Sequence, residues 1–217
     1  MAIKIFCDFD GTITEGDNIV NLIKQFAPPS VSELTSEVLN GKISIREGVE
    51  KMFATIPSTK KQAMTDYVID RTVIRDGFND FIQFVNEQQI ELKVVSGGLD
   101  FFVHPILAEY LPPSAILCNR TDFTGSTVKI HWDHSCDALC SHDCGMCKPS
   151  VKRKFSESND FIIVIGDSIT DLQIAKEANL IFARDFLKNK CEELSLPYIP
   201  FESFYDIRAS LEKEVLV

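Results

Sequence analysis

Carboxylates in two separate motifs of the sequence could carry out phosphoryl transfer. Asp8 and Asp10 lie two residues apart in a polar loop that follows an apolar run, and Asp167 and Asp171 lie far along the chain. Carboxylates gathered at one site repel one another and raise each other's pKa unless a cation that prefers oxygen ligands neutralises them. These four residues therefore predict a magnesium site in which one carboxylate attacks phosphorus.

The predicted chemistry is hydrolysis in two steps. Asp8 can take the phosphoryl group as the nucleophile. Asp10 is free to protonate the leaving oxygen as a general acid and then to activate water against the aspartyl-phosphate. Covalent catalysis by a carboxylate splits one difficult step into two easier ones.

Two further polar positions could hold the oxygens of a phosphate. Ser96-Gly97-Gly98 follows a second apolar run, and Lys148 lies directly before Pro149 at the start of an expected helix. A hydroxyl and an ammonium can bind the non-bridging oxygens, and a helix N-terminus is a natural anion site. We therefore expect Ser96, Gly97, Gly98 and Lys148 to bind substrate.

Each of these motifs also has an ordinary structural explanation. Asp and Gly favour turns without any catalytic role, and a Ser-Gly-Gly sequence is often a strand-to-helix turn. Asp171 could simply cap the following helix, and Lys148 alone would be a surface lysine. The joint occurrence of the motifs at compatible places favours catalysis.

The order of the expected elements predicts an α/β fold with a Rossmann-like core and a central, mainly parallel sheet. Short apolar runs alternate with amphipathic stretches, which is βαβ rhythm. Near-continuous apolar strands belong in a parallel sheet covered on both faces, and such sheets bind ligands at the carboxyl ends of their strands. The motifs follow runs of this kind at residues 3–7, 92–95 and 161–165.

Between about residues 14 and 74 no strand pattern is present. Capping-box spacing at Ser30–Glu33 and Ser44–Glu47, each followed by apolar residues on one helical face, predicts helices there. We expect a small all-helical cap of four helices over 14–74, inserted after the first strand into a catalytic core formed by 1–13 and 75–217.

Several residues near the predicted site are candidates for recognising the substrate. Glu15 and Asp17 lie just past the catalytic loop, as does Asn18. Arg46 lies in the helical segment, where a solvated face or a pair with Glu50 is the alternative. Two aromatic residues after the Ser-Gly-Gly motif could line an apolar pocket, although core packing is their commoner use: Phe101 and Phe102.

Four of the seven cysteines lie in one short segment, separated by three, three and two residues: Cys136, Cys140, Cys144 and Cys147. Such spacing is within the range of structural zinc sites. The alternatives are free thiols in a compact loop, or a disulfide formed after purification.

Charge and hydrophobicity restrict the partners. A formal net charge of −10 and a pI near 4.9 oppose binding to nucleic acid or to an acidic membrane surface. The apolar runs are far shorter than the roughly 20 residues that span a bilayer, and the first residues lack signal-peptide features. We expect a cytoplasmic protein that acts on a small phosphorylated metabolite.

Four motifs together resemble, in order and spacing, the signatures of haloacid-dehalogenase-like phosphatases: Asp8-Phe-Asp-Gly-Thr12, Val94-Val-Ser-Gly-Gly98, Lys148 and Gly166-Asp-Ser-Ile-Thr-Asp171. The place of the helical insertion is similar to that of the phosphoserine-phosphatase-like subgroup. The resemblance implies that Asp8 is the nucleophile and a magnesium ligand, and that Asp10 is the acid/base and also binds magnesium through its backbone carbonyl. It makes Asp167 the third protein ligand, and Asp171 a residue that orients Asp167 or a metal-bound water.

A closer resemblance, over nearly the whole chain, is to the phosphatase family of methionine salvage. It is carried by Asp17-Asn18, Phe26-Ala-Pro-Pro29, Ser96-Gly-Gly-Leu-Asp-Phe-Phe102, the segment from His134 to Pro149, and Ala183-Arg-Asp185. This resemblance implies hydrolysis of 2-hydroxy-3-keto-5-methylthiopentenyl-1-phosphate.

Other functions are compatible with the same residues. A phosphatase for phosphoserine or phosphocholine, or a phosphomutase, would use the same aspartates. A phospho-acceptor signalling module also uses an acidic cluster, a lysine and magnesium on a parallel sheet. Such a module is smaller, lacks a cap and gains nothing from a base that activates water, so Asp10 favours an enzyme.

Overall fold

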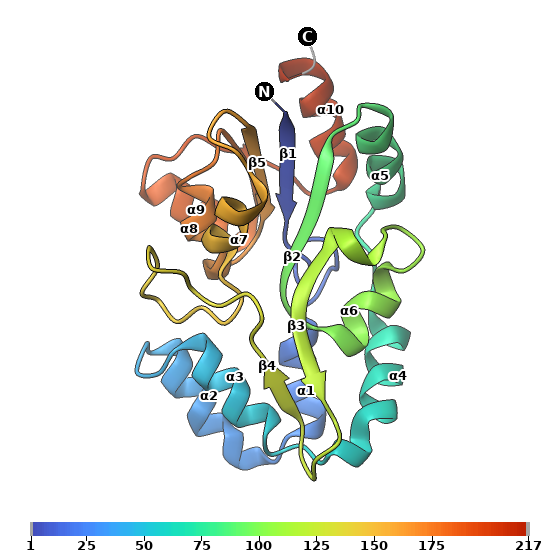
Figure 1. Ribbon diagram of the computed structural model, residues 1–217, viewed down its shortest axis with the longest axis vertical. Coiled ribbons are helices and arrows are strands. Elements are labelled where there is room, and N and C mark those ends of the chain that lie inside the picture. The colour runs from blue at the N-terminus through green and yellow to red at the C-terminus, as the bar shows by residue number, and fades with distance from the viewer. Residues whose placement is uncertain (1, 216–217) are drawn as a thin grey trace.

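The computed structural model describes residues 2–215, and within them seven strands form one twisted sheet (Figure 1). The spatial order is β4-β3-β2-β1-β5-β6-β7. Neighbouring strands are parallel except β4, which runs antiparallel to β3. The strands are β1 (Ile3–Cys7), β2 (Glu91–Leu99), β3 (Ile116–Asp122), β4 (Lys129–His131), β5 (Phe161–Gly166), β6 (Leu180–Ala183) and β7 (Ile199–Pro200). The mainly parallel sheet expected from the sequence is confirmed.

The central strands carry apolar side chains on both faces. Successive side chains of a strand point to opposite sides, so each strand contributes to a core on either face of the sheet. Ile5 and Ile163 belong to one buried cluster, which includes side chains of α5 (Phe78–Glu87), α6 (Asp100–Leu107) and α10 (Phe204–Glu214). Phe6 and Val164 belong to a second cluster on the other face, with α7 (Lys148–Phe155), α8 (Leu172–Ala175) and α9 (Asp185–Glu193). Helices therefore cover both faces of the sheet.

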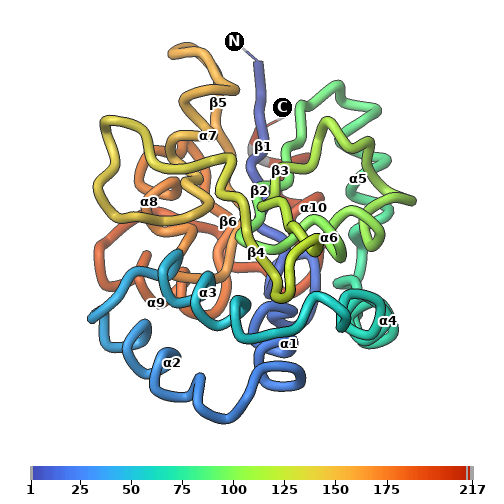
Figure 2. Tube along the Cα trace, turned by 60° about the horizontal axis from the view of Figure 1, so that its bottom comes forward, coloured from blue at the N-terminus to red at the C-terminus, as the bar shows by residue number. Residues whose placement is uncertain are grey.

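A helical segment follows β1 and lies beyond the carboxyl ends of the central strands (Figure 1). Figure 2 shows this end of the molecule, with the four helices spread across it. They are α1 (Asn18–Phe26), α2 (Ser32–Leu39), α3 (Ile45–Phe53) and α4 (Lys61–Arg71).

The chain leaves and re-enters the core at one place. Thr14 and Ile74 form an antiparallel bridge, with hydrogen bonds from the backbone N–H of Arg75 to the Ile13 carbonyl and from Glu15 to Val73. The buried Arg75 guanidinium also donates hydrogen bonds to carbonyl oxygens of the loop after β1, those of Gly11, Thr12 and Thr14. This side chain, which the sequence reading did not single out, ties the helical segment's return point to the catalytic loop.

Two local expectations for helix starts had different outcomes. Ser44 caps α3 as predicted, since its hydroxyl accepts a hydrogen bond from the Glu47 backbone N–H at 3.0 Å. The Glu47 side chain pairs with Lys51 and does not complete the capping box. The capping box at Ser30 is wrong. Ser30 lies within a 3-10 turn, Pro29–Val31, and α2 begins at Ser32 without a side-chain cap. The rigid Pro28-Pro29 pair starts this turn, because proline fits a first helical position and needs no capped N–H there.

No helix among the described residues is long and apolar enough to cross a membrane.

Candidate active site

The carboxyl ends of the strands bring the predicted catalytic residues together. Asp8 follows β1, Ser96 lies near the end of β2, and Asp167 follows β5. Carboxylate oxygens of Asp8, Asp167 and Asp171 all lie within 4.8 Å of one another. Residues separated by more than 150 positions in sequence thus share one site.

Asp8 is only 6% exposed and is fixed on two sides. One carboxylate oxygen accepts a hydrogen bond from the Phe9 N–H at 2.8 Å and lies 2.8 Å from the Lys148 Nζ. Burial, and next the charge of Asp171, raise the pKa of Asp8 well above its usual range, while Lys148 opposes the rise.

Lys148 is the first residue of α7 and is nearly fully buried. Its ammonium lies between two carboxylates, 2.8 Å from Asp8 and 2.6 Å from Asp171. Burial alone would lower the pKa of Lys148, but the charges of Asp171 and Asp8 outweigh it and raise the pKa above its ordinary value. The lysine therefore presents a fixed positive charge beside Asp8, and it is not the surface lysine that the alternative reading allowed.

Asp171 accepts hydrogen bonds from four donors. One oxygen binds Lys148, and the other receives the backbone N–H groups of Asp167 and Ser168 and the Ser168 hydroxyl, at 3.0–3.2 Å. It forms a capping box with Ser168, as the structural alternative proposed, and it also orients Asp167 and Lys148. Direct metal binding by Asp171 would compete with these donors, so the geometry favours the positioning role.

Asp167 is held against the loop after β1. Its carboxylate accepts a hydrogen bond from the Thr12 hydroxyl at 2.7 Å. Burial and the charge of Asp171 raise the pKa of Asp167 to about 6, against the lowering effect of Thr12. Gly11 has a φ of +81°, and a Cβ there would lie 2.4 Å from an Asp167 oxygen. Only glycine allows this close approach of loop and carboxylate.

Asp10 is oriented by the start of α1. One oxygen accepts hydrogen bonds from the backbone N–H of Asn18 at 3.0 Å and from its side-chain amide at 2.8 Å. Burial, followed by the charge of Asp17, raises the pKa of Asp10 to about 7, although the bonds from Asn18 oppose the rise. The other oxygen faces Gly98, where a Cβ would come within 3.1 Å of it. A carboxyl with a pKa near neutrality suits proton exchange in both directions.

Ser96 is fully buried, and its hydroxyl accepts a hydrogen bond from the Gly98 N–H at 2.9 Å. Register between β2 and β3 is irregular over this stretch. The Ser-Gly-Gly motif thus lies within an irregular stretch of β2, between Asp10 and a pocket that Gly97 lines.

That pocket lies between the helical segment and the core and has a cavity volume of about 40 Å³. Its polar lining is Gly97, Asn119, Lys148 and Thr170, and the rest of the wall is Ile45, Val49, Trp132, Cys144 and Met146. The wall therefore combines groups that offer charge and hydrogen bonds with apolar surface.

Asn119 belongs to the pocket wall, and its polar side chain directly after an apolar run is a sequence signal that could have marked it as a site residue. It is a buried polar residue at the end of the apolar run Ile116-Leu-Cys118. Its amide donates a hydrogen bond to the Gly97 carbonyl at 2.9 Å, while its Oδ1 has no hydrogen-bond partner within the part of the chain that the structure describes. Buried acceptors are normally satisfied, so Oδ1 is an unusual buried acceptor beside the site.

Other candidates lie elsewhere. Asp17 caps α1 by accepting a hydrogen bond from Val20, and Glu15 is exposed; neither lines the pocket. Asp17 thus has a structural role at the start of α1, and substrate recognition by Glu15 and Asp17 stays a prediction. Phe101 and Phe102 are buried and contact each other, Phe123 and Phe9 in the core. Their use is core packing, because the first turn of α6 faces inward.

The four clustered cysteines are brought together in the loop between β4 and α7, and their sulfur atoms lie within 4.8 Å of one another. Arg46 also meets this loop, where it pairs with Asp143 at 2.9 Å and not with Glu50.

The strand ends of this mainly parallel α/β sheet carry an Asp-x-Asp loop, a Ser-Gly-Gly motif, a buried lysine and a second aspartate pair. Together these groups define a phosphoryl-transferring hydrolase. The chain belongs to the haloacid dehalogenase-like hydrolases, whose sequence model matches residues 5–176. It is 50% identical over 212 residues to the 2-hydroxy-3-keto-5-methylthiopentenyl-1-phosphate phosphatase of Bacillus cereus, an alignment that covers 98% of this chain and 97% of the relative.

Solved structures share the fold at low identity. A phosphoserine phosphohydrolase-like protein from Francisella tularensis aligns with a TM-score of 0.69 and 20% identity over 97% of this chain and 99% of that one. A phosphoserine phosphatase from T. onnurineus aligns with a TM-score of 0.72 and 13% identity over 98% and 96%.

Proposed function

We propose that the protein is a magnesium-dependent phosphatase that hydrolyses 2-hydroxy-3-keto-5-methylthiopentenyl-1-phosphate to 1,2-dihydroxy-3-keto-5-methylthiopentene and phosphate, in the methionine salvage pathway. Identity of 50% over nearly full length to relatives of that activity supports the assignment. The observation that carries it is a pocket lined both by Lys148 and by apolar side chains, those of Ile45, Val49, Trp132 and Met146.

The donor set fits a magnesium ion. Asp8 and Asp167 offer carboxylate oxygens, the ligands that this hard cation prefers. Burial, and next the charge of Asp171, raise the pKa of both carboxyls, and a cation between them would favour their charged form. When bound by these two side chains and the backbone carbonyl of Asp10, magnesium would neutralise charge on the phosphate and on the aspartates.

Asp8, Asp10 and Lys148 carry out the two steps, phosphoryl transfer to Asp8 and hydrolysis of the aspartyl-phosphate. An oxygen of Asp8 forms a bond to phosphorus as the bond to the substrate's C1 oxygen breaks, and Asp10 gives that leaving oxygen its proton. Lys148, 2.8 Å from Asp8, holds a phosphoryl oxygen and its developing charge. Asp10 then takes a proton from water, which attacks the aspartyl-phosphate, releases phosphate and restores Asp8.

The apolar side chains that line the pocket suit the methylthio tail of this substrate. Trp132, Met146 and Val49 offer apolar surface to the methylthio group, and sulfur makes favourable contacts with aromatic rings. Phosphoserine would need charged partners for its amino and carboxylate groups, and Lys148 is the sole charged residue among those lining this pocket.

We further infer that residues 14–74 act as a cap on the core 1–13 and 75–217. The paired exit and return at Thr14 and Ile74 supports this division. Contacts of Ser44 and Arg46 with Asp143 link the cap to the loop before α7. All seven cysteines are free thiols, as a cytoplasmic enzyme would have them.

A phosphate-release assay tests the substrate. With magnesium, kcat/KM for the methylthiopentenyl phosphate should exceed that for phosphoserine by at least roughly a hundredfold, the scale at which pocket polarity discriminates. EDTA should abolish both activities. Equal hydrolysis of phosphoserine would contradict the assignment, and stoichiometric transfer without free phosphate would indicate a mutase.

A further inference from the structure

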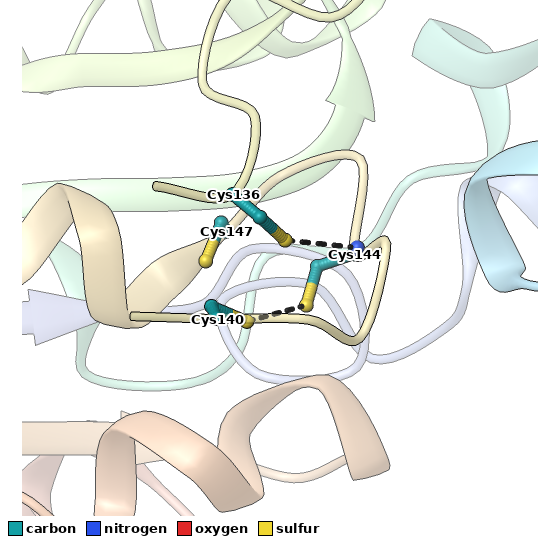
Figure 3. A group of neighbouring side chains, drawn as sticks. All are labelled: Cys136, Cys140, Cys144 and Cys147. Carbon is teal, nitrogen blue, oxygen red and sulfur yellow. Dashed lines mark hydrogen bonds between the residues drawn. The ribbon is translucent and has the colours of Figure 1, made fainter. Parts of the chain in front are cut away.

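The loop between β4 and α7 gathers four thiols that the proposed phosphatase chemistry does not use. Figure 3 shows Cys136, Cys140, Cys144 and Cys147 with their sulfur atoms turned toward one another. These atoms all lie within 4.8 Å of one another, yet each cysteine is a free thiol. The side chains come from a segment of 12 residues that contains no helix or strand.

The spacing of the sulfur atoms matches a tetrahedral metal site. Zinc–sulfur bonds of about 2.3 Å place the corners of a tetrahedron about 3.8 Å apart. The Sγ atoms of Cys140 and Cys144 are 3.8 Å apart. A disulfide would need about 2.05 Å between two sulfur atoms, so the observed separation fits shared coordination and not a covalent bond.

The backbone is already turned to present the thiols. Asp143 and Gly145, on either side of Cys144, both have positive φ, of 50° and 74°. At Gly145 a Cβ would come within 2.7 Å of the Trp132 ring, so this turn packs directly on the pocket wall. The Cys144 N–H donates a hydrogen bond to the Cys136 sulfur at 3.4 Å.

We propose that Cys136, Cys140, Cys144 and Cys147 bind one zinc ion as a structural site. Four thiolates select a soft or borderline cation such as zinc, whereas the aspartates of the phosphate site select magnesium. The two sites therefore do not compete for the same ion.

The position of the loop gives this zinc a positioning role. Cys147 directly precedes Lys148, and its N–H donates a hydrogen bond to the His134 carbonyl at 2.7 Å. Cys144 and Met146 line the pocket, and Asp143 accepts hydrogen bonds from Ser44 and Arg46 at the start of α3. One ion would thus fix the loop that carries the buried lysine, part of the pocket wall and the docking residue of the cap.

Metal analysis of protein purified without chelator tests the proposal directly. We expect about one zinc per chain that persists after dialysis against magnesium buffer. Cys140→Ser and Cys144→Ser should each lose most of it, whereas Cys191→Ser, which changes a buried thiol of α9, should retain it. Zinc retained at full stoichiometry in both loop variants would overturn the assignment.

Cobalt substitution needs no variant and so remains decisive where a serine variant fails to fold. Apoprotein titrated with Co²⁺ should develop the visible bands of tetrahedral cobalt and a thiolate-to-cobalt charge-transfer band, with an endpoint at about one equivalent. Zinc should then displace the colour. A zinc-free protein with four readily titrated thiols and no such spectrum, or a loop disulfide in protein handled under reducing conditions, would refute the proposal. Neither readout depends on phosphatase activity, so it stands or falls separately from the proposed substrate.

Discussion

Two glycines with the same backbone strain but different surroundings allow a test of the Asp167 geometry. Gly11 and Gly41 both have positive φ, of 81° and 66°. A Cβ at Gly41 would meet no atom within 4 Å, whereas one at Gly11 would lie 2.4 Å from Asp167. Gly11→Ala therefore adds a steric clash to a conformational cost that Gly41→Ala shares.

The two substitutions should cost similar backbone energy, about 1–2 kcal/mol for a left-handed alanine. In Gly11→Ala the Asp167 carboxylate must also move, because no real Cβ contact is as short as 2.4 Å. Displacing a ligand of a hard cation should raise the magnesium concentration for half-maximal activity at least about tenfold, which corresponds to about 1.4 kcal/mol.

Phosphate release measured across a magnesium titration, together with denaturant unfolding, separates the two effects. Both variants should lose comparable unfolding free energy from the backbone, and only Gly11→Ala should shift its magnesium midpoint. If Gly11→Ala and Gly41→Ala showed the same magnesium midpoint, the close approach of Gly11 to Asp167 would have no bearing on the metal site, and the assignment of Asp167 as a ligand would be refuted.

Four other substitutions test separate parts of the site. Asp8→Asn should abolish phosphate release in a protein that still folds, since an amide does not attack phosphorus; retained turnover would reassign the nucleophile. Lys148→Met leaves two buried carboxylates without their cation and should cost roughly 3–5 kcal/mol in urea unfolding without magnesium; an unchanged stability would contradict the ion-pair geometry. Trp132→Ala should lower kcat/KM for the methylthiopentenyl phosphate by roughly 10–200-fold and spare hydrolysis of acetyl phosphate; equal losses would exclude Trp132 from the tail pocket. Arg46→Ala should raise KM, whereas Lys51→Ala, an exposed change on the same helix, should not. Equal KM values in the two variants would show that the contact between Arg46 and Asp143 does not affect substrate binding.

The catalytic end of the sheet could be predicted because local sequence determines it. Asp8 and Asp167 each follow an apolar strand at once, and parallel strands bring their carboxyl ends to one edge. The mainly parallel sheet and the helical segment after β1 follow from the same alternation of patterns. The roles assigned to individual site residues are still predictions, since geometry places the groups without measuring their chemistry.

The pocket wall could not be predicted, because it is assembled from distant segments. Ile45 comes from α3, Trp132 follows β4 and Met146 precedes α7. No local pattern relates such residues, and their meeting depends on how the cap and the cysteine loop fold back on the core. Phe101 and Phe102 follow the Ser-Gly-Gly motif in sequence, but the fold places them in the core. Arg46 pairs with Asp143, which belongs to the irregular loop before α7, and no local pattern indicates that contact.

The bridge between Thr14 and Ile74 joins the two ends of the helical segment, so the segment is inserted into the core as a closed loop. The entropic cost of closing a flexible loop grows slowly, by about 0.6 kcal/mol for each doubling of its length. The entropic cost to the core thus depends little on the length of what is inserted there. Evolution can lengthen, shorten or replace the segment and so exchange one leaving group for another, while the phosphoryl chemistry at the strand ends stays as it is.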